Sequence, residues 1–250
     1  MNYKILNRNT LKWIALITMF LDHIGAIIGF STFANMNIGY VYDILRIIGR
    51  ISFPIFAFFI AEGWFFTHNK FNYFSTILIF AIISQPIYSI SLDLNISNLN
   101  ILWTFLLSIS ICYLIDKYKQ NLSYSFLYSC LIFCIIMVVL FLELLGLRFS
   151  YGIFGIILPV IFYIFYHNNL KNSKLIMWIC VVVLLIALSI INIPINTTIK
   201  FSNFYQFFSL LSIPFIILYN GKKGKYNFKW LFYIFYPTHL IIIYLFSLLI

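Results

Sequence analysis

Arg46 and Arg50 are the residues whose types and spacing point most directly to chemistry. They lie four residues apart in an otherwise apolar run, 45–63, that carries Glu62 at its far end. Residues four apart share one face of a helix, and a guanidinium binds a carboxylate or phosphate through two parallel hydrogen bonds. A charge at the centre of a bilayer costs about 2.5 to more than 10 kcal/mol, so this pair predicts an acidic partner, water or an anionic ligand.

Three ionisable residues in other apolar runs suit acid–base catalysis. Asp22 and His23 are adjacent in the first run, and His239 follows Pro237 in the last. Histidine takes up a proton near neutral pH, and a carboxylate can hold its imidazole in one tautomer. Pro237 removes a backbone donor and is expected to open the helix beside His239. This set predicts group transfer with either histidine as general base; a purely structural ion pair between Asp22 and Arg50 is the alternative.

Basic residues outside these runs are candidates for binding an acyl donor. Coenzyme A carries a pyrophosphate and a 3′-phosphate, which basic side chains recognise. The candidates are Lys70, Lys222 and Lys223, together with Arg46 and Arg50. The cysteines lie inside apolar runs with no histidine at metal-ligand spacing, so we expect packing roles and no metal site.

The elements that must position these residues are membrane-spanning helices. The 250-residue chain is 63% hydrophobic and 9% charged, against roughly 25% charged residues in soluble domains. Apolar runs of about 17 to 25 residues suit one bilayer crossing. Nine apolar runs are found, of which the sixth is short, at 11–30, 43–66, 72–91, 99–116, 123–145, 151–166, 174–193, 201–219 and 229–249. The prediction is an all-α, polytopic membrane helix bundle forming one domain over residues 1–250.

The distribution of positive charge predicts the orientation of this bundle. Loops and run ends on the N-terminal side hold twelve of the sixteen Lys and Arg residues, and the opposite loops hold only Arg148 and Lys200. Cytoplasmic loops collect Lys and Arg, so we expect the N-terminus inside, the C-terminus outside and residence in the cytoplasmic membrane. The net charge of +10 then reports topology and does not predict nucleic-acid binding. The first run has no cleavage site after it and is expected to be retained.

Seven segments, in order, resemble the TraX family of membrane proteins. They are LKWIALITMFLDHIGAI, LRIIGRISFPIFAFFIAEGW, ISQPIY, NILWT, YGIFGIILPVIFY, LYNGKKG and FYIFYPTHL. DHIG, GRISFPIFAF and FYPTH are the most specific parts. The family's named activity is N-terminal acetylation of conjugative pilin subunits with acetyl-coenzyme A. The chain is also similar, more remotely, to multipass membrane acyltransferases that use cytoplasmic acyl donors.

The resemblance implies an integral membrane acetyltransferase that acts on an amine, or a hydroxyl, of a peptide, pilin-like or cell-envelope acceptor. The positions that it implies for the site are Asp22, His23, Arg46, Arg50, Glu62 and His239. We expect Asp22, His23 and His239 to be catalytic, the basic candidates to hold acetyl-coenzyme A, and Glu62 and Gln85 to bind substrate. Ser150 stands where the family pattern predicts an acidic residue, which puts a pilin acceptor in question.

Two other classes of function remain open at this point. A transporter or flippase would use the intramembrane Asp, His and Arg as a proton relay or substrate site. A non-catalytic assembly or immunity factor would not need these groups at all.

Overall fold

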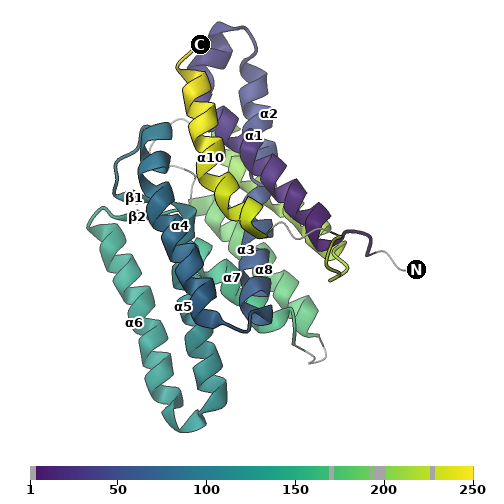
Figure 1. The fold of residues 1–250 in the computed structure, drawn as a ribbon, viewed down its shortest axis with the longest axis vertical. Coiled ribbons are helices and arrows are strands. Elements are labelled where there is room, and N and C mark those ends of the chain that lie inside the picture. Colours follow the sequence, from purple (N-terminus) through teal and green to yellow (C-terminus); the bar gives the residue numbers. More distant parts are fainter. Residues whose placement is uncertain (1–3, 169–171, 192, 194–200, 226–228, 250) are drawn as a thin grey trace. The chain divides into compact units, whose positions relative to one another are not determined.

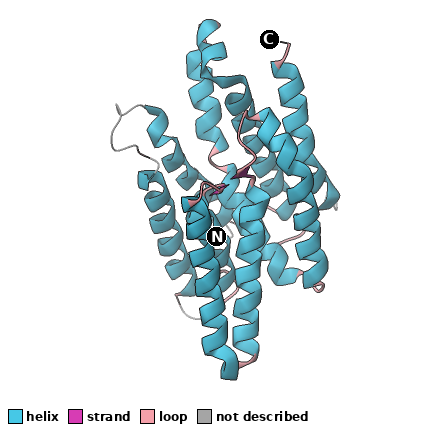
Figure 2. Cartoon of the chain, turned by 90° about the vertical axis from the view of Figure 1, so that its left-hand side faces the viewer, coloured by secondary structure: helices cyan, strands magenta, loops and turns pink. Residues whose placement is uncertain are grey.

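The computed structural model describes residues 4–168, 172–191, 193, 201–225 and 229–249. It is helical almost throughout, and strand is confined to one very short pair (Figure 2). The chain divides into two compact units, each discontinuous in sequence. The first unit comprises Met1–Phe56, Ile90–Asp93 and Val182–Ile250, and the second comprises Ala57–Ser89 and Leu94–Val181.

Within the described residues, seven helical stretches are long and apolar enough to cross a membrane. They are Arg8–Gly29, Gly39–Phe66, Lys70–Ser91, Ile101–Gln120, Leu122–Leu144, Ser173–Ile191 and Trp230–Ser247. Two shorter apolar helices, Gly152–Phe165 and Phe201–Ile217, coincide with the sixth and eighth predicted spans. The all-α polytopic class is therefore confirmed, while the count of nine spans and their orientation stay predictions.

The first unit is organised around its N-terminal helix. Helix α1 (Arg8–Asn35) begins where the Asn7 side chain accepts a hydrogen bond from the Thr10 backbone amide, at 3.0 Å. It packs against α2 (Gly39–Gly49) and α10 (Lys229–Ser247) (Figure 1). The unit also contains the 3₁₀ helix η2 (Phe201–Leu211), which contacts α2, and the short α9 (Ser212–Ile217). Helix α1 is thus in contact with both α2 and α10.

The second predicted span, 43–66, is broken into two helices: α2 ends at Gly49 and α3 runs from Ser52 to Phe66. Pro54 has no N–H to donate to the Arg50 carbonyl, which opposes a continuous helix here. The Ser52 hydroxyl instead donates to the Gly49 carbonyl at 2.7 Å. The predicted span therefore corresponds to the helical stretch Gly39–Phe66, with a break at Arg50 that the apolar pattern does not predict.

Prolines elsewhere behave differently. Helix α10 continues through Pro237, and α4 (Lys70–Ser91) continues through Pro86. Pro237 was expected to open the helix beside His239, and this was wrong. Neighbouring groups can satisfy the backbone that a proline frees within a membrane helix.

The second unit is a bundle of helices with a short two-stranded sheet that joins two of its loops. It contains α4, α5 (Ile101–Gln120), η1 (Leu122–Tyr124), α6 (Ser125–Leu144), α7 (Gly152–Phe165) and the start of α8 (Ser173–Ile191). Helix α5 packs on α6 and α7. The parallel strands β1 (Asn98–Leu99) and β2 (Arg148–Phe149) tie the loops that precede α5 and α7.

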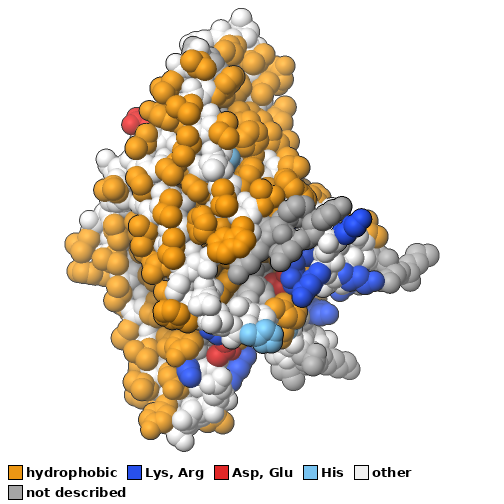
Figure 3. All heavy atoms as spheres, in the orientation of Figure 1, with side chains coloured by type: hydrophobic (Ala, Val, Ile, Leu, Met, Phe, Trp, Pro, Cys, Tyr) orange, Lys and Arg blue, Asp and Glu red, His pale blue; other side chains and the backbone are white. Residues whose placement is uncertain are grey.

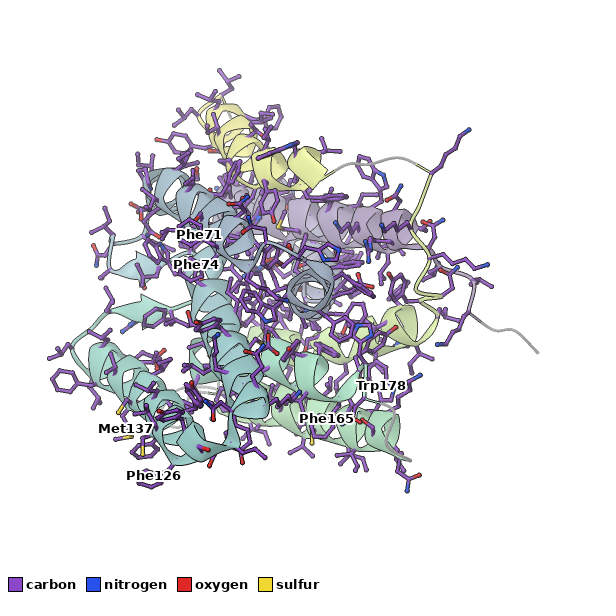
Figure 4. All side chains as sticks on the ribbon, turned by 60° about the horizontal axis from the view of Figure 1, so that its bottom comes forward. Phe71, Phe74, Phe126, Met137, Phe165 and Trp178 are labelled. Atoms are coloured by element: carbon purple, nitrogen blue, oxygen red, sulfur yellow. The ribbon has the colours of Figure 1, made fainter. Side chains whose placement is uncertain are left out.

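The surface of the molecule is apolar, as lipid contact requires. Figure 3 shows one face covered mainly by hydrophobic side chains, with Lys and Arg gathered in a few places. On α6, Phe126 is 81% exposed, and both Phe126 and Met137 lie at the margin of their bundle (Figure 4). A soluble protein rarely exposes such an expanse of apolar side chains. The protein is therefore a multi-pass membrane protein.

Helices α1 and α2 approach closely because Gly49 has no side chain. A Cβ built on Gly49 would lie 2.2 Å from the Cβ of Asp22, whereas one on Gly25 would lie 3.1 Å from the flexible Arg46 Cδ. Small residues permit this kind of approach between membrane helices.

We expect Gly49→Ala to lower the free energy of unfolding in detergent by about 1–3 kcal/mol, the usual cost of overpacking. Gly25→Ala is the matched control and should cost less, because the Arg46 side chain can shift. Chemical denaturation followed by circular dichroism measures both. Equal stability of Gly49→Ala and wild type would contradict the close packing.

Candidate functional site

An acidic residue and two basic residues meet between α1 and α2. The Arg50 Nη2 atom lies 2.5 and 2.7 Å from the two carboxylate oxygens of Asp22. The Arg46 Nη1 atom lies 2.9 Å from Asp22 Oδ1 and donates to the Asp22 backbone carbonyl at 3.1 Å. The predicted partnership of Asp22 with the arginines is therefore present. Two guanidiniums on one carboxylate leave this trio with a net positive charge.

Two histidines far apart in sequence meet between α1 and α10. His23 Nδ1 and His239 Nε2 are 2.8 Å apart, and His239 Nδ1 lies 2.6 Å from the Phe235 backbone carbonyl oxygen. His239 is buried and stacks on the Phe235 ring, whereas His23 is half-buried. The two histidines predicted from the sequence are thus brought into direct contact.

The direction of the hydrogen bonds in this chain follows from the carbonyl. A carbonyl oxygen only accepts, so His239 Nδ1 carries the hydrogen, and the Nε2 atom of the neutral His239 ring is an acceptor. His23 Nδ1 must then donate to it, which leaves His23 Nε2 with a free lone pair. We find no hydrogen-bond partner for this Nε2 atom among the described residues. In the neutral pair, His23 is therefore the base.

Asp22 and His23 serve different neighbours because adjacent helical residues point about 100° apart. Asp22 faces the arginines of α2, and His23 faces α10, where Tyr236 makes an edge contact with its ring. The first unit thus places an ionic cluster and a histidine pair at the same level of α1. Asp22 does not orient His23 directly, since no hydrogen bond joins the two side chains among the described residues.

Residues that the sequence analysis missed extend the ionic cluster. Gln206, on η2, accepts a hydrogen bond from Arg50 Nη1 at 3.5 Å. The next residue back, Tyr205, donates to the carboxylate of Asp43, which lies one turn before Arg46 on α2. The three-residue spacing of Asp43 and Arg46 was the available sequence signal; Gln206 gave none beyond being polar within an apolar run.

Lys222 and Lys223 lie in an exposed loop at the start of α1. Backbone hydrogen bonds join Leu6 to Leu218 and Asn220, and the Arg8 amide to the Lys222 carbonyl, at 2.9–3.0 Å. The loop is thereby held against the N-terminal end of α1. Arg8 and His23 are about 22 Å apart along the helix, at 1.5 Å per residue. The structure therefore keeps these lysines away from the histidine pair.

Lys70, Glu62 and Gln85 belong to the second unit. Lys70 donates to the Trp64 carbonyl, and its ammonium lies 4.6 Å from the centre of the Trp64 ring. Glu62 is only 4% exposed. The structure places these three in a different unit from the histidine pair, and their roles in binding stay predictions.

Gln85 has well-defined internal contacts. Its Oε1 atom accepts from the Asn100 backbone and side-chain amides, both at 3.0 Å, and its Nε2 atom donates to the Asn98 carbonyl at 2.9 Å. The Asn100 side chain also donates to the Ala81 carbonyl at 2.9 Å. Gln85 thus anchors the loop before α5, and both ends of its amide are engaged within the protein.

Comparison with known proteins identifies the family. A sequence model described as "TraX protein" matches residues 7–247, nearly the whole chain. This chain belongs to the TraX family. The match includes the helices that carry both the ionic cluster and the histidine pair.

The TraX chain is also similar to a curated bacterial protein. The probable fimbrial assembly protein FimC, serogroup H1, of Dichelobacter nodosus is 27% identical over 243 residues, covering 92% of this chain and 91% of that protein. No solved structure matches the chain.

Proposed function

We propose that this TraX-family protein is an integral membrane acetyltransferase of the cytoplasmic membrane. It transfers an acetyl group from acetyl-coenzyme A to an amine of a peptide or cell-envelope acceptor. The observation that supports this most directly is the oriented histidine pair, because it leaves His23 Nε2 unprotonated. The adjacent residue of α1, Asp22, belongs to the positively charged ionic cluster.

His23 acts as the general base in this proposal. As the amine nitrogen attacks the thioester carbonyl carbon, a C–N bond forms, the C–S bond breaks, and His23 Nε2 takes the amine proton. That proton then passes to the departing thiolate, so the products are an N-acetyl amine and free coenzyme A. His239 accepts the His23 Nδ1 hydrogen bond and stabilises the charged ring during the transfer.

The ionic cluster supports the same step electrostatically. In this proposal the net positive charge of the cluster stabilises the negative charge that develops on the acyl oxygen, and Asp22 compensates part of the arginine charge in the resting protein. Preorganised donors of this kind cost little reorganisation during reaction. The Asp22 carboxylate thus has a charge-balancing role rather than a role in proton transfer.

The loop at the start of α1 suits the phosphates of the donor. Lys222, Lys223 and Lys225 are exposed there, on the side predicted to be cytoplasmic. The length of α1 between this loop and His23, about 22 Å, is of the order of the extended arm of coenzyme A. Donor phosphates bound at the loop would therefore place the thioester near the histidine pair.

The acceptor class is inferred from the family and its relative. The Dichelobacter nodosus relative is named as a probable fimbrial assembly protein. This favours a peptide amine on a pilin-like subunit over a small-molecule acceptor.

The direct test is calorimetric titration of the purified protein with acetyl-coenzyme A. We expect saturable binding that weakens at least about tenfold when Lys222, Lys223 and Lys225 are replaced by glutamine, because each lost phosphate contact removes a charge-assisted interaction. Binding should also weaken as salt concentration rises.

In the control variant, Lys117 and Lys119 at the end of α5 in the second unit are replaced by glutamine. This variant should bind acetyl-coenzyme A as tightly as wild type. A folded wild-type protein that does not bind acetyl-coenzyme A would overturn the proposal and favour the transporter alternative.

A further inference from the structure

The segment η2, which contacts α2, has an unusual backbone. Eleven consecutive residues, Phe201–Leu211, form a 3₁₀ helix, although 3₁₀ runs longer than three or four residues are uncommon and often mark strained or functional segments. This segment contacts α2, the helix that carries Arg46. It therefore places residues of a distant part of the chain against the ionic cluster.

Gln206 is the residue of η2 that touches the cluster, and its amide has a defined orientation. The Arg50 guanidinium has only donors, so the amide oxygen of Gln206 must face it, as the 3.5 Å contact with Arg50 Nη1 indicates. The Nε2 group then points away from Arg50. Gln206 is only 7% exposed, and its Nε2 atom has no hydrogen-bond partner among the described residues.

A second hydrogen-bond donor of the ionic cluster also has no partner among the described residues. Arg46 Nε is buried and has no hydrogen-bond partner within the described part of the chain, although Arg46 Nη1 is bound to Asp22. Buried donors in proteins are nearly always paired. Two unpaired donors in one positively charged cluster therefore indicate an oxygen acceptor supplied by a ligand.

We propose that Gln206 and Arg46 form a binding site for a carbonyl oxygen of a substrate. The inference rests on the proposed acetyltransferase function, and it adds a specificity-determining residue, Gln206, that neither the family match nor the sequence pattern assigns. A neutral amide donor and a partly compensated arginine suit an oxygen with partial negative charge. A doubly charged phosphate would instead be expected to gather uncompensated basic groups.

Two substrates contain such an oxygen. The acetyl thioester of the donor has one that free coenzyme A lacks, and a peptide acceptor has one on its first residue, next to the reacting amine. The two sources are separated by comparing donor binding with acceptor kinetics.

The test uses Gln206→Glu, which keeps an oxygen facing Arg50 but removes the Nε2 donor, and Gln206→Leu, which removes both. Binding of acetyl-coenzyme A and of coenzyme A is measured by calorimetry. Transfer of radiolabelled acetyl groups is measured with a mixture of short peptides bearing free N-terminal amines. Thr18→Val is the control, because the Thr18 hydroxyl bonds only carbonyls of its own helix turn among the described contacts.

If the oxygen belongs to the donor, both Gln206 variants bind acetyl-coenzyme A about tenfold more weakly, the loss of one hydrogen bond, and bind coenzyme A normally. If it belongs to the acceptor, donor binding is unchanged and the KM for peptide rises about tenfold. Thermal unfolding in detergent shows whether each variant is folded.

Folded Gln206 variants that match wild type in donor binding and in peptide KM would overturn the Gln206 site alone. A wild-type protein that neither binds acetyl-coenzyme A nor acetylates peptides would overturn the proposed function itself, so the two failures are distinguishable.

Discussion

Replacing His23 with glutamine is expected to lower the rate of acetyl transfer by about 10²–10⁴-fold, the usual contribution of a general base. The side chain keeps its polarity and approximate size, so the fold should be retained. The loss arises because the Nε2 lone pair, which the hydrogen-bond chain through His239 leaves free, is the proton acceptor. Single-turnover transfer of radiolabelled acetyl groups in detergent measures it directly.

His239 should respond differently, because it acts through His23. A glutamine at position 239 can still accept the hydrogen bond from His23 Nδ1 through its carbonyl oxygen, so His239→Gln should lower the rate of acetyl transfer by about tenfold or less. His239→Leu removes that acceptor and should lower the rate further. Equal losses for His23→Gln and His239→Gln would contradict the assigned proton positions, and full activity of both would remove the histidine pair from the mechanism.

Replacing Asp22 with alanine is expected to lower the free energy of unfolding by about 3–5 kcal/mol, as when one member of a buried ion pair is removed. Asp22 is the carboxylate to which both Arg46 and Arg50 bind, at 2.5–2.9 Å. Without it, two guanidiniums repel each other in a region of low dielectric constant. Denaturation of the purified protein in detergent gives the measurement.

The matched control removes the charges together. A variant with Asp22→Ala, Arg46→Met and Arg50→Met should recover much of the lost stability, because buried ion clusters can be replaced by apolar residues of similar volume at little cost. It should nevertheless be inactive. Unchanged stability of the single Asp22→Ala variant would mean that water, rather than Asp22, compensates the arginines.

The helices were predictable because a bilayer imposes a length on each apolar run. All nine predicted runs coincide with helical segments, even though two of these are short. The break at Arg50 was not predicted because the apolar pattern is continuous across it. The helix breaks just before Pro54, whereas the helices that contain Pro86 and Pro237 continue through these prolines. Composition alone does not distinguish these outcomes.

The depth of the candidate site residues in the membrane was predictable from the sequence. The rotation of α1 about its own axis was not. Asp22, His23 and His239 lie ten to twelve residues after the starts of runs 11–30 and 229–249, which both begin on the side predicted to be cytoplasmic. This spacing predicts similar depths in the membrane, and the structure brings the two histidines together across 216 residues of sequence. Which side of α1 faces α2 depends on packing, notably at Gly49, and so the separate partners of Asp22 and His23 could not be derived. Gln206 could not be predicted because a single neutral polar residue within an apolar run carries no signal of its own.

The pairing of His23 with His239 has a consequence for the order of assembly during synthesis. Arg46 and Arg50 follow Asp22 closely, so this charge cluster can form on an early helical hairpin. The partner of His23 lies on α10, the last helix of the described chain, and the residues between include the whole second unit. Asp22 therefore compensates part of the arginine charge early in synthesis. The proposed base is completed only after almost every other helix has entered the membrane.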